Sequence, residues 1–150
     1  MIDRFHRFLY CISEISRCWH RIAADEMEQY GLKGPHATYL TTIHRHPEGI
    51  TAPRISELCG KDKSDVSRTM ALMENKGLVV KEGIHQNLYR GVYKLTETGR
   101  QAAEQISRRA ALAVEMAGRD LSEENRAVFY QALGQITEQL QLLSQQGLPE

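Results

Sequence analysis

The chain has 150 residues, 41% of them hydrophobic and 25% charged, and its formal net charge is zero. This length fits one domain, or one domain with an assembly element, and is enough to bury a core without disulfides or metals. The three cysteines form no CxxC motif and no long apolar run is present, which argues against a disulfide framework, a structural zinc site, a signal peptide and a membrane span; we therefore expect a cytoplasmic protein.

Residues 3–28 predict a long first helix that ends at Tyr30-Gly31. Its apolar residues recur at alternating steps of three and four, as in a helical seam: Phe5, Phe8, Ile12, Ile15, Trp19 and Ile22. A lone helix of this length is marginal in water, so the stripe has to pack against something. The partner is either another helix of the same chain or a second copy.

Two shorter helices follow. The first starts at Gly34-Pro35 and stops at residues 46–49, and the second starts near Thr51 and ends at Gly60, which allows a sharp turn. Apolar residues at helical spacing predict their core faces: Ala37, Leu40 and Ile43, then Ile55, Leu58 and Cys59.

The next helix is the candidate DNA reader. It begins at Asp62 or Ser64 as the capping residue, and Gly77 ends it. At 100° per residue, one side is apolar and the opposite side is small, polar and cationic. The apolar side consists of Val66, Met70 and Met73, and the outward side of Ser64, Arg68, Ala71 and Asn75.

A slim polar helix of this kind fits a DNA major groove, although a plain solvated face would have similar residues. Arg68 can pair with a guanine, while Asp65 either orients Arg68 or accepts a hydrogen bond from a cytosine amine. The hydroxyls reach phosphates or bases, and the lysines that precede the helix lie near phosphates. The expected contacts are Lys61, Lys63, Ser64, Asp65, Ser67 and Arg68.

Residues 78–81 and 91–95 are rich in β-formers and predict a hairpin with a long tip over residues 82–90. Its cations can reach a minor groove, whose negative potential attracts them. The expected contacts are Lys81, His85 and Arg90. Residues 31–100 hold 11 Lys and Arg against 7 Asp and Glu, a net charge of +4, so the cationic segment coincides with the candidate motif.

The last third of the chain predicts two helices. Thr96 caps an Ala-rich helix that runs to about Gly118, and Ser122 caps the final one. The final helix has a second seam with steps of four and three, formed by Phe129, Leu133, Ile136, Leu140 and Leu143.

Four segments together resemble the MarR family of bacterial winged helix-turn-helix regulators: Ile55-Ser56-Glu57-Leu58, Lys63 to Arg68, Met73 to Val79, and Leu95-Thr96-Glu97-Thr98-Gly99. The resemblance implies a mainly α fold with a small β-hairpin (α+β), in which the N- and C-terminal helices form a dimerisation bundle. It makes residues 1–150 one subunit, with dimerisation helices at 1–30 and 118–150, a winged helix-turn-helix at 31–100 and a connecting helix at 97–117.

The resemblance also implies a function. We expect a DNA-binding transcriptional regulator, a ligand-responsive repressor that binds a palindromic operator as a homodimer, with no enzymatic activity, cofactor or metal. The tip of the hairpin departs from the family. Asn87, Leu88 and Tyr89 stand where relatives often have an Asp followed by Arg, and Arg90 comes one residue later.

Some features leave alternatives open. The residues Trp19, Tyr30, His36 and Tyr39 line either an effector cleft or the core. Cys11 and Cys18, on the first helix, suggest a redox-sensing regulator of the same fold. A third reading is a winged-helix module that contacts protein without binding DNA.

Overall fold

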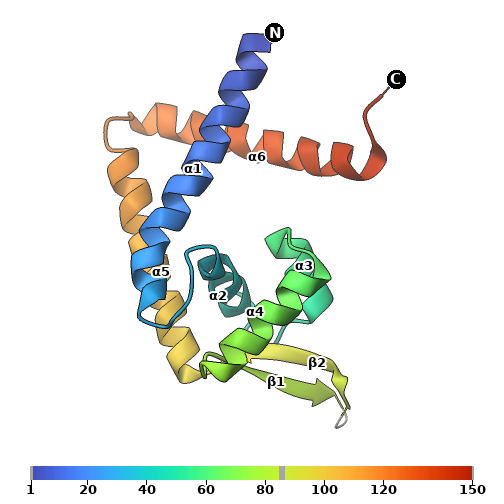
Figure 1. Cartoon of the computed structure of the whole chain (residues 1–150). Helices are drawn as coiled ribbons and strands as arrows, with labels where there is room; N and C mark the ends of the chain where they lie inside the picture. Colours follow the sequence, from blue (N-terminus) through green and yellow to red (C-terminus); the bar gives the residue numbers. More distant parts are fainter. Residues whose placement is uncertain (1, 85–86, 150) are drawn as a thin grey trace. The chain divides into compact units, whose positions relative to one another are not determined.

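The computed structural model describes residues 2–84 and 87–149, apart from the side chains of residues 2, 84 and 87–90 (Figure 1). The described chain forms six α-helices and a two-stranded antiparallel sheet, as expected for the fold. The elements are α1 (Ile2–Glu28), α2 (His36–His44), α3 (Ala52–Cys59), α4 (Lys63–Asn75), β1 (Val79–Ile84), β2 (Asn87–Leu95), α5 (Glu97–Ala117) and α6 (Glu123–Gln146). They divide into two compact units, Met1–Ala111 and Leu112–Glu150.

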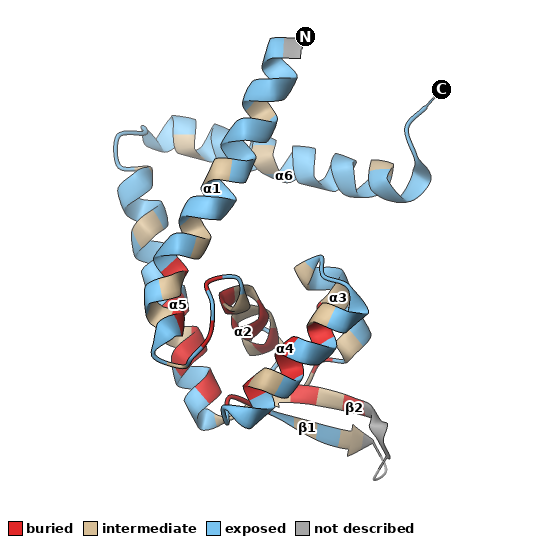
Figure 2. Ribbon diagram, in the orientation of Figure 1, coloured by how far each residue is buried: buried red, intermediate tan, exposed pale blue. Residues whose placement is uncertain are grey.

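The first unit contains the hydrophobic core. Side chains from the C-terminal end of α1, from α2, α3 and α4, from the hairpin and from the start of α5 are buried together (Figure 2). The predicted core residues of α2 and α4 are all buried. In α3, Ile55 is buried and Cys59 is half-buried, but Leu58 is 44% exposed, so its predicted place in the core is wrong. Helical spacing defines an arc of the helix, and the neighbouring elements do not cover the whole arc.

The two helices of the helix-turn-helix begin and end where local chemistry stops them. Thr51 caps α3 by accepting from the Arg54 amide, and Asp62, rather than Ser64, caps α4 by accepting from the Asp65 amide. Gly60, with a φ of 62°, and Gly77, with a φ of 71°, adopt the left-handed conformation that glycine tolerates best. These local devices fix where α3 and α4 begin and end.

The hairpin is longer than predicted. Val79 pairs with Leu95 at its base, and the ladder continues to Ile84 and Asn87, so residues 82–90 are not one long loop. The register shifts between Glu82 and Ile84, which is the signature of a β-bulge. Backbone pairing therefore extends into a segment that was predicted to be a loop because its residues are largely polar. Ile50 adds a single antiparallel bridge to Tyr93, with N···O distances of 3.1 and 2.7 Å.

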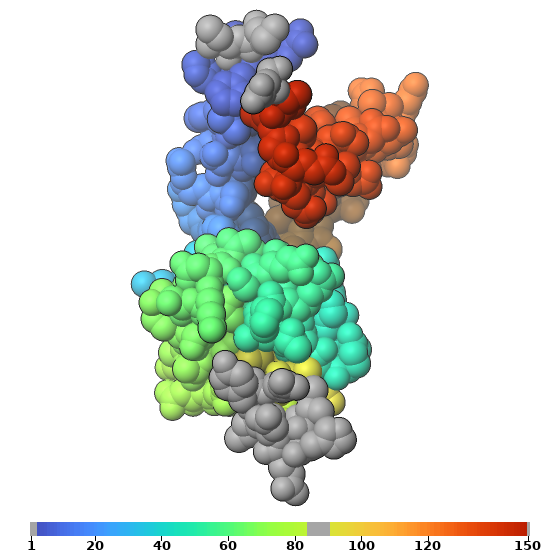
Figure 3. Space-filling model, turned by 90° about the vertical axis from the view of Figure 1, so that its right-hand side faces the viewer, coloured from blue at the N-terminus to red at the C-terminus, as the bar shows by residue number. Residues whose placement is uncertain are grey.

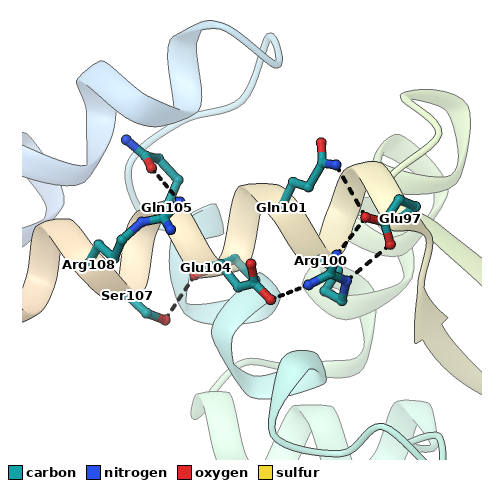
Figure 4. A network of polar contacts seen from close by, with 8 residues as sticks. Glu97, Arg100, Gln101, Glu104, Gln105, Ser107 and Arg108 are labelled. Atoms are coloured by element: carbon teal, nitrogen blue, oxygen red, sulfur yellow. Dashed lines mark hydrogen bonds and ion pairs between the residues drawn. The ribbon is translucent and has the colours of Figure 1, made fainter.

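The junction between the hairpin and α5 is closely packed. The Thr96 hydroxyl donates to the Gly77 carbonyl at 2.6 Å and accepts from the Gly99 amide at 3.1 Å, while the Thr96 amide donates to the Leu78 carbonyl at 3.0 Å. Gly99 lies so close to Leu78 that a Cβ at this position would be 1.9 Å from the Leu78 carbonyl oxygen. On the exposed side of α5, Arg100 bridges Glu97 and Glu104 (Figure 4).

The second unit contains the end of α5 and α6. Ser122 caps α6 as predicted, accepting from the Asn125 amide at 3.1 Å. No residue of α6 is buried, and its apolar side chains are largely exposed (Figure 2). The helices in the described part of the chain lack the length and apolar character needed to cross a membrane.

Candidate nucleic-acid interface

The exposed face of α4 is polar and cationic. Lys63, Ser64, Ser67 and Arg68 are all exposed, whereas Val66, on the opposite side of the helix, is 1% exposed. Figure 3 shows the surface of the segment from cyan to green that contains α3 and α4. Four of the residues expected to contact DNA from this helix, Lys63, Ser64, Ser67 and Arg68, thus share one accessible face, and the fifth, Asp65, does not.

The cations near the start of α4 are available to a ligand. Lys61 is exposed in the turn between α3 and α4, and Lys63 begins α4. Within the described residues, none of Lys61, Lys63 and Arg68 takes part in an ion pair. In the described part of the chain, no carboxylate lies within ion-pair distance of these three charges.

The wing contributes one described candidate. Lys81 on β1 is half-buried, and its Nζ lies 5.3 Å from the centroid of the Tyr93 ring, a cation–π distance. His85 and the side chain of Arg90 lie outside the described residues. The expected roles of these three residues in DNA binding stay predictions.

The side chain of Asp65 is half-buried and contacts the protein interior. The Tyr39 hydroxyl donates a hydrogen bond to the Asp65 carboxylate, which is part-buried. No ion pair joins Asp65 to Arg68 in the described part of the chain, so the expected orientation of Arg68 by Asp65 is not seen. This bond links α2 to the first turn of α4, and nothing in the sequence pattern indicated it.

Thr69, one turn after Asp65, is 3% exposed. Burial and the bond to Asp65 raise the pKa of Tyr39 well above its ordinary value, partly opposed by Thr69. Sequence reasoning missed Thr69, although its i+4 spacing from Asp65 places both on one side of α4.

The four residues proposed for an effector cleft differ in their surroundings. Tyr39 is 1% exposed and belongs to the core, while Trp19 and Tyr30 are half-buried and pack against that core. The ring of the half-buried His36 meets the Tyr39 ring edge to face, with 6.5 Å between centroids. Burial lowers the pKa of His36, partly opposed by the charge of Asp65.

An open cavity of about 210 Å³ lies elsewhere in the first unit. It forms where the end of α2 meets the junction of β2 and α5, and its lining includes His44, Pro47, Lys94 and Arg100. None of the four proposed effector residues lines it. Among the described residues, no group of three or more His, Cys, Asp or Glu side chains is arranged to hold a metal ion.

The cysteines fall into two groups. Cys11 and Cys18 on α1 are exposed. Cys59 at the end of α3 is half-buried, with its Sγ 3.5 Å from the Thr42 hydroxyl, and burial raises its pKa. A raised pKa makes the Cys59 thiol less reactive than an ordinary one.

The sequence of the helix-turn-helix and of β1 decides the family. Residues 30–84, which run from the end of α1 through α4 to the last residue of β1, match the model described as the MarR family. This segment carries the MarR-family sequence. The earlier resemblance, which rested on short motifs, is confirmed.

Solved structures match over almost the whole chain. A MarR-family regulator from Listeria monocytogenes, complexed with 26mer DNA, superposes with a TM-score of 0.80 at 23% identity, covering 95% of this chain and 96% of that one. The S. aureus MepR–DNA complex gives 0.76 at 20% identity, covering 88% and 97%. A MarR regulator from Methanosarcina mazei Go1 gives 0.80 at 18% identity, covering 91% and 90%. No curated protein sequence matches this chain significantly.

The superpositions show that this chain shares their fold beyond the segment that matches the family model. The coverage includes both long terminal helices and the hairpin. The MarR family, whose model matches residues 30–84, consists of transcriptional regulators rather than enzymes.

Proposed function

We propose that this MarR-family protein binds double-stranded DNA in a sequence-specific manner, with α4 as the recognition helix and the hairpin as the wing. The observation that carries the proposal is the exposed face of α4, where Lys63, Ser64, Ser67 and Arg68 stand together. Arg68 reads a guanine, the hydroxyls bond phosphates or bases, and Lys61 and Lys63 hold phosphates. The two structural neighbours solved with DNA support the assignment.

The DNA-binding form is a homodimer. In the first unit, α1 exposes a stripe that includes Phe5 at 58% and Ile15 at 61%. In the second unit, α6 exposes Phe129 at 46% and Leu140 at 50%. Soluble monomers rarely expose contiguous apolar stripes of this length, so a second copy is the expected cover, with residues 1–30 and 118–150 as dimerisation helices. Two recognition helices then read half-sites about 34–36 Å apart, or a multiple of this distance.

Selection of bound sequences from random DNA tests this proposal. A sequence-specific dimer enriches an imperfect palindrome whose half-site spacing matches the distance between the helices. Sedimentation at micromolar concentration should give twice the 17.1 kDa mass of the chain. A monomer, or a selection without enrichment, contradicts the proposal and favours a winged-helix module that contacts protein.

Salt dependence separates the same two classes. Lys and Arg contacts to phosphates release counterions, so DNA affinity falls steeply as the salt concentration rises. Binding to a protein surface responds much less. Affinities measured between about 50 and 200 mM salt therefore distinguish the two functions, and a DNA reader should lose at least about tenfold over this range.

The regulator is a ligand-responsive repressor in this proposal. A small molecule can shift the protein away from the DNA-binding geometry only if it prefers the non-binding geometry. The half-buried Trp19, Tyr30 and His36 remain the proposed contacts, with Tyr39 as the core residue behind them. Ligand screening by change of melting temperature, repeated with operator DNA present, tests for such a molecule.

Redox regulation is the second candidate, because Cys11 and Cys18 are the exposed thiols of the chain's three cysteines. Mass measurement after mild peroxide shows whether either thiol is oxidised, and a DNA-binding assay on the same sample shows whether oxidation releases DNA. Oxidation without loss of binding rejects a sensing role.

A further inference from the structure

A buried tyrosine joins the helix that precedes the helix-turn-helix to the proposed recognition helix. Tyr39 is the largest side chain that is completely buried in the core, and its hydroxyl donates to the carboxylate of Asp65, 26 residues further along the chain. Both partners lie within the first unit, on α2 and α4. The bond is therefore a direct link between α2 and the first turn of α4.

The position of Asp65 makes this link relevant to DNA binding. Asp65 lies between Lys63 and Ser64 on one side and Ser67 and Arg68 on the other, which are the exposed residues of α4. A carboxylate free to turn outward here would repel phosphates and would compete with them for Arg68. The bond from Tyr39 keeps the negative charge on the protein side of the helix.

The same charge suits its present location. Asp65 is in the first turn of α4, where the helix dipole favours an anion, and its backbone amide donates to the Asp62 cap at 2.7 Å. The bond from Tyr39 ties this first turn of α4 to one atom of α2, which restrains rotation of α4 about its axis.

We propose that Tyr39 is a positioning residue for DNA recognition: its hydroxyl holds the Asp65 carboxylate away from DNA and fixes the rotation of α4. The proposal rests on the proposed DNA-binding function for its consequence, but the restraint on α4 does not depend on DNA. Asp65 accordingly acts from the protein side and not as a base reader.

The decisive variant is Tyr39→Phe, which removes one oxygen and keeps the buried ring. Thr41→Val is the matched control, because it removes a hydroxyl from a half-buried residue of α2 whose hydrogen bonds stay within that helix, to the carbonyls of Ala37 and Thr38. Amide hydrogen exchange is the first measurement and uses no DNA. We expect faster exchange in the first two turns of α4 in Tyr39→Phe, by about fivefold or more, with unchanged exchange at Ile106 in α5. Unchanged exchange in α4 overturns the restraint.

The second measurement is affinity for the selected operator, well below the melting temperature. The freed carboxylate should weaken binding by about fivefold or more in Tyr39→Phe, whereas the affinity of the Thr41→Val control should stay unchanged. Asp65→Asn removes the charge but keeps an oxygen that accepts from Tyr39. The double variant Tyr39→Phe with Asp65→Asn should therefore recover most of the lost affinity.

The outcomes separate the two proposals. If Tyr39→Phe lowers the melting temperature but not the affinity for the operator, the double variant has no lost affinity to recover. The hydroxyl then makes only a structural bond, and the inference is wrong. If the wild-type protein selects no DNA sequence but α4 still loosens in Tyr39→Phe, the proposed function fails while the restraint on α4 stands.

Discussion

Replacement of Gly99 by alanine probes the junction between the wing and α5. Gly99 belongs to the Leu95-Thr96-Glu97-Thr98-Gly99 motif, and a Cβ there would lie 1.9 Å from the Leu78 carbonyl oxygen and 2.9 Å from its carbon. An ordinary carbon–oxygen contact is about 3.3 Å, so the two backbones must separate by roughly 1.4 Å. Neither segment is a flexible side chain that can move aside.

The size of the effect follows from what this movement breaks. The Thr96 amide bond to Leu78 and the Thr96 hydroxyl bond to Gly77 both cross the junction, and each contributes about 1 kcal/mol. Overpacking of a rigid site costs about 1–3 kcal/mol in addition. We therefore expect Gly99→Ala to lower the free energy of unfolding by about 3–5 kcal/mol.

Gly134→Ala is the control for the change of residue itself. Gly134 lies inside α6, with nothing within 4 Å of an added Cβ, so the substitution should stabilise the helix by about 1 kcal/mol. Urea denaturation followed by helical circular dichroism, at one fixed protein concentration, measures both variants. A Gly99→Ala variant within about 1 kcal/mol of the wild type would refute the claim that close backbone packing requires this glycine.

Three further predictions concern recognition, assembly and pH. Arg68→Ala should reduce discrimination between operator and random DNA by about 1–3 kcal/mol, and unchanged specificity excludes Arg68 as a base reader. Lys63→Ala should weaken binding to all DNA and flatten the dependence of affinity on salt by about one unit of slope. Competition binding at several salt concentrations measures both effects. Ile15→Glu should turn the dimer into a monomer in sedimentation experiments at micromolar concentration, while Ser13→Glu on the same helix should not; a dimeric Ile15→Glu protein contradicts the assigned interface. Because burial lowers the pKa of His36, the folded state binds a proton at His36 less readily than the unfolded state does. The contribution of neutral His36 to stability is therefore complete above a pH of about 6.5 and is lost as the pH falls below it. The melting temperature should fall more between pH 7 and 5 in the wild type than in His36→Gln, and equal falls would contradict the assignment.

Interactions local in the chain could be predicted from the sequence. Thr51, Thr96 and Ser122 cap their helices as expected, because a cap depends on a side chain and an amide three residues later. Gly77 ends α4 for an equally local reason, its positive φ. The periodic apolar residues of α2 and α4 likewise identified the buried faces of these helices.

Other features depended on surroundings that spacing does not specify. Leu58 has the helical spacing of a core residue, yet no neighbouring element covers it and it stays exposed. The polar stretch after Lys81 did not predict a strand, because backbone pairing with β2 extends the hairpin despite weak local propensity.

The sequence by itself determined the order of the elements and the polar face of α4, since these follow from contacts within a few residues and from periodicity. Only the tertiary structure decided that Tyr39 is a core residue bonded to Asp65 and that Gly99 faces the Leu78 carbonyl. Each of these contacts joins residues that are distant in the chain. The physical reason is that no local pattern in the sequence relates a donor to an acceptor 26 residues away, because the two meet only when α2 packs against α4.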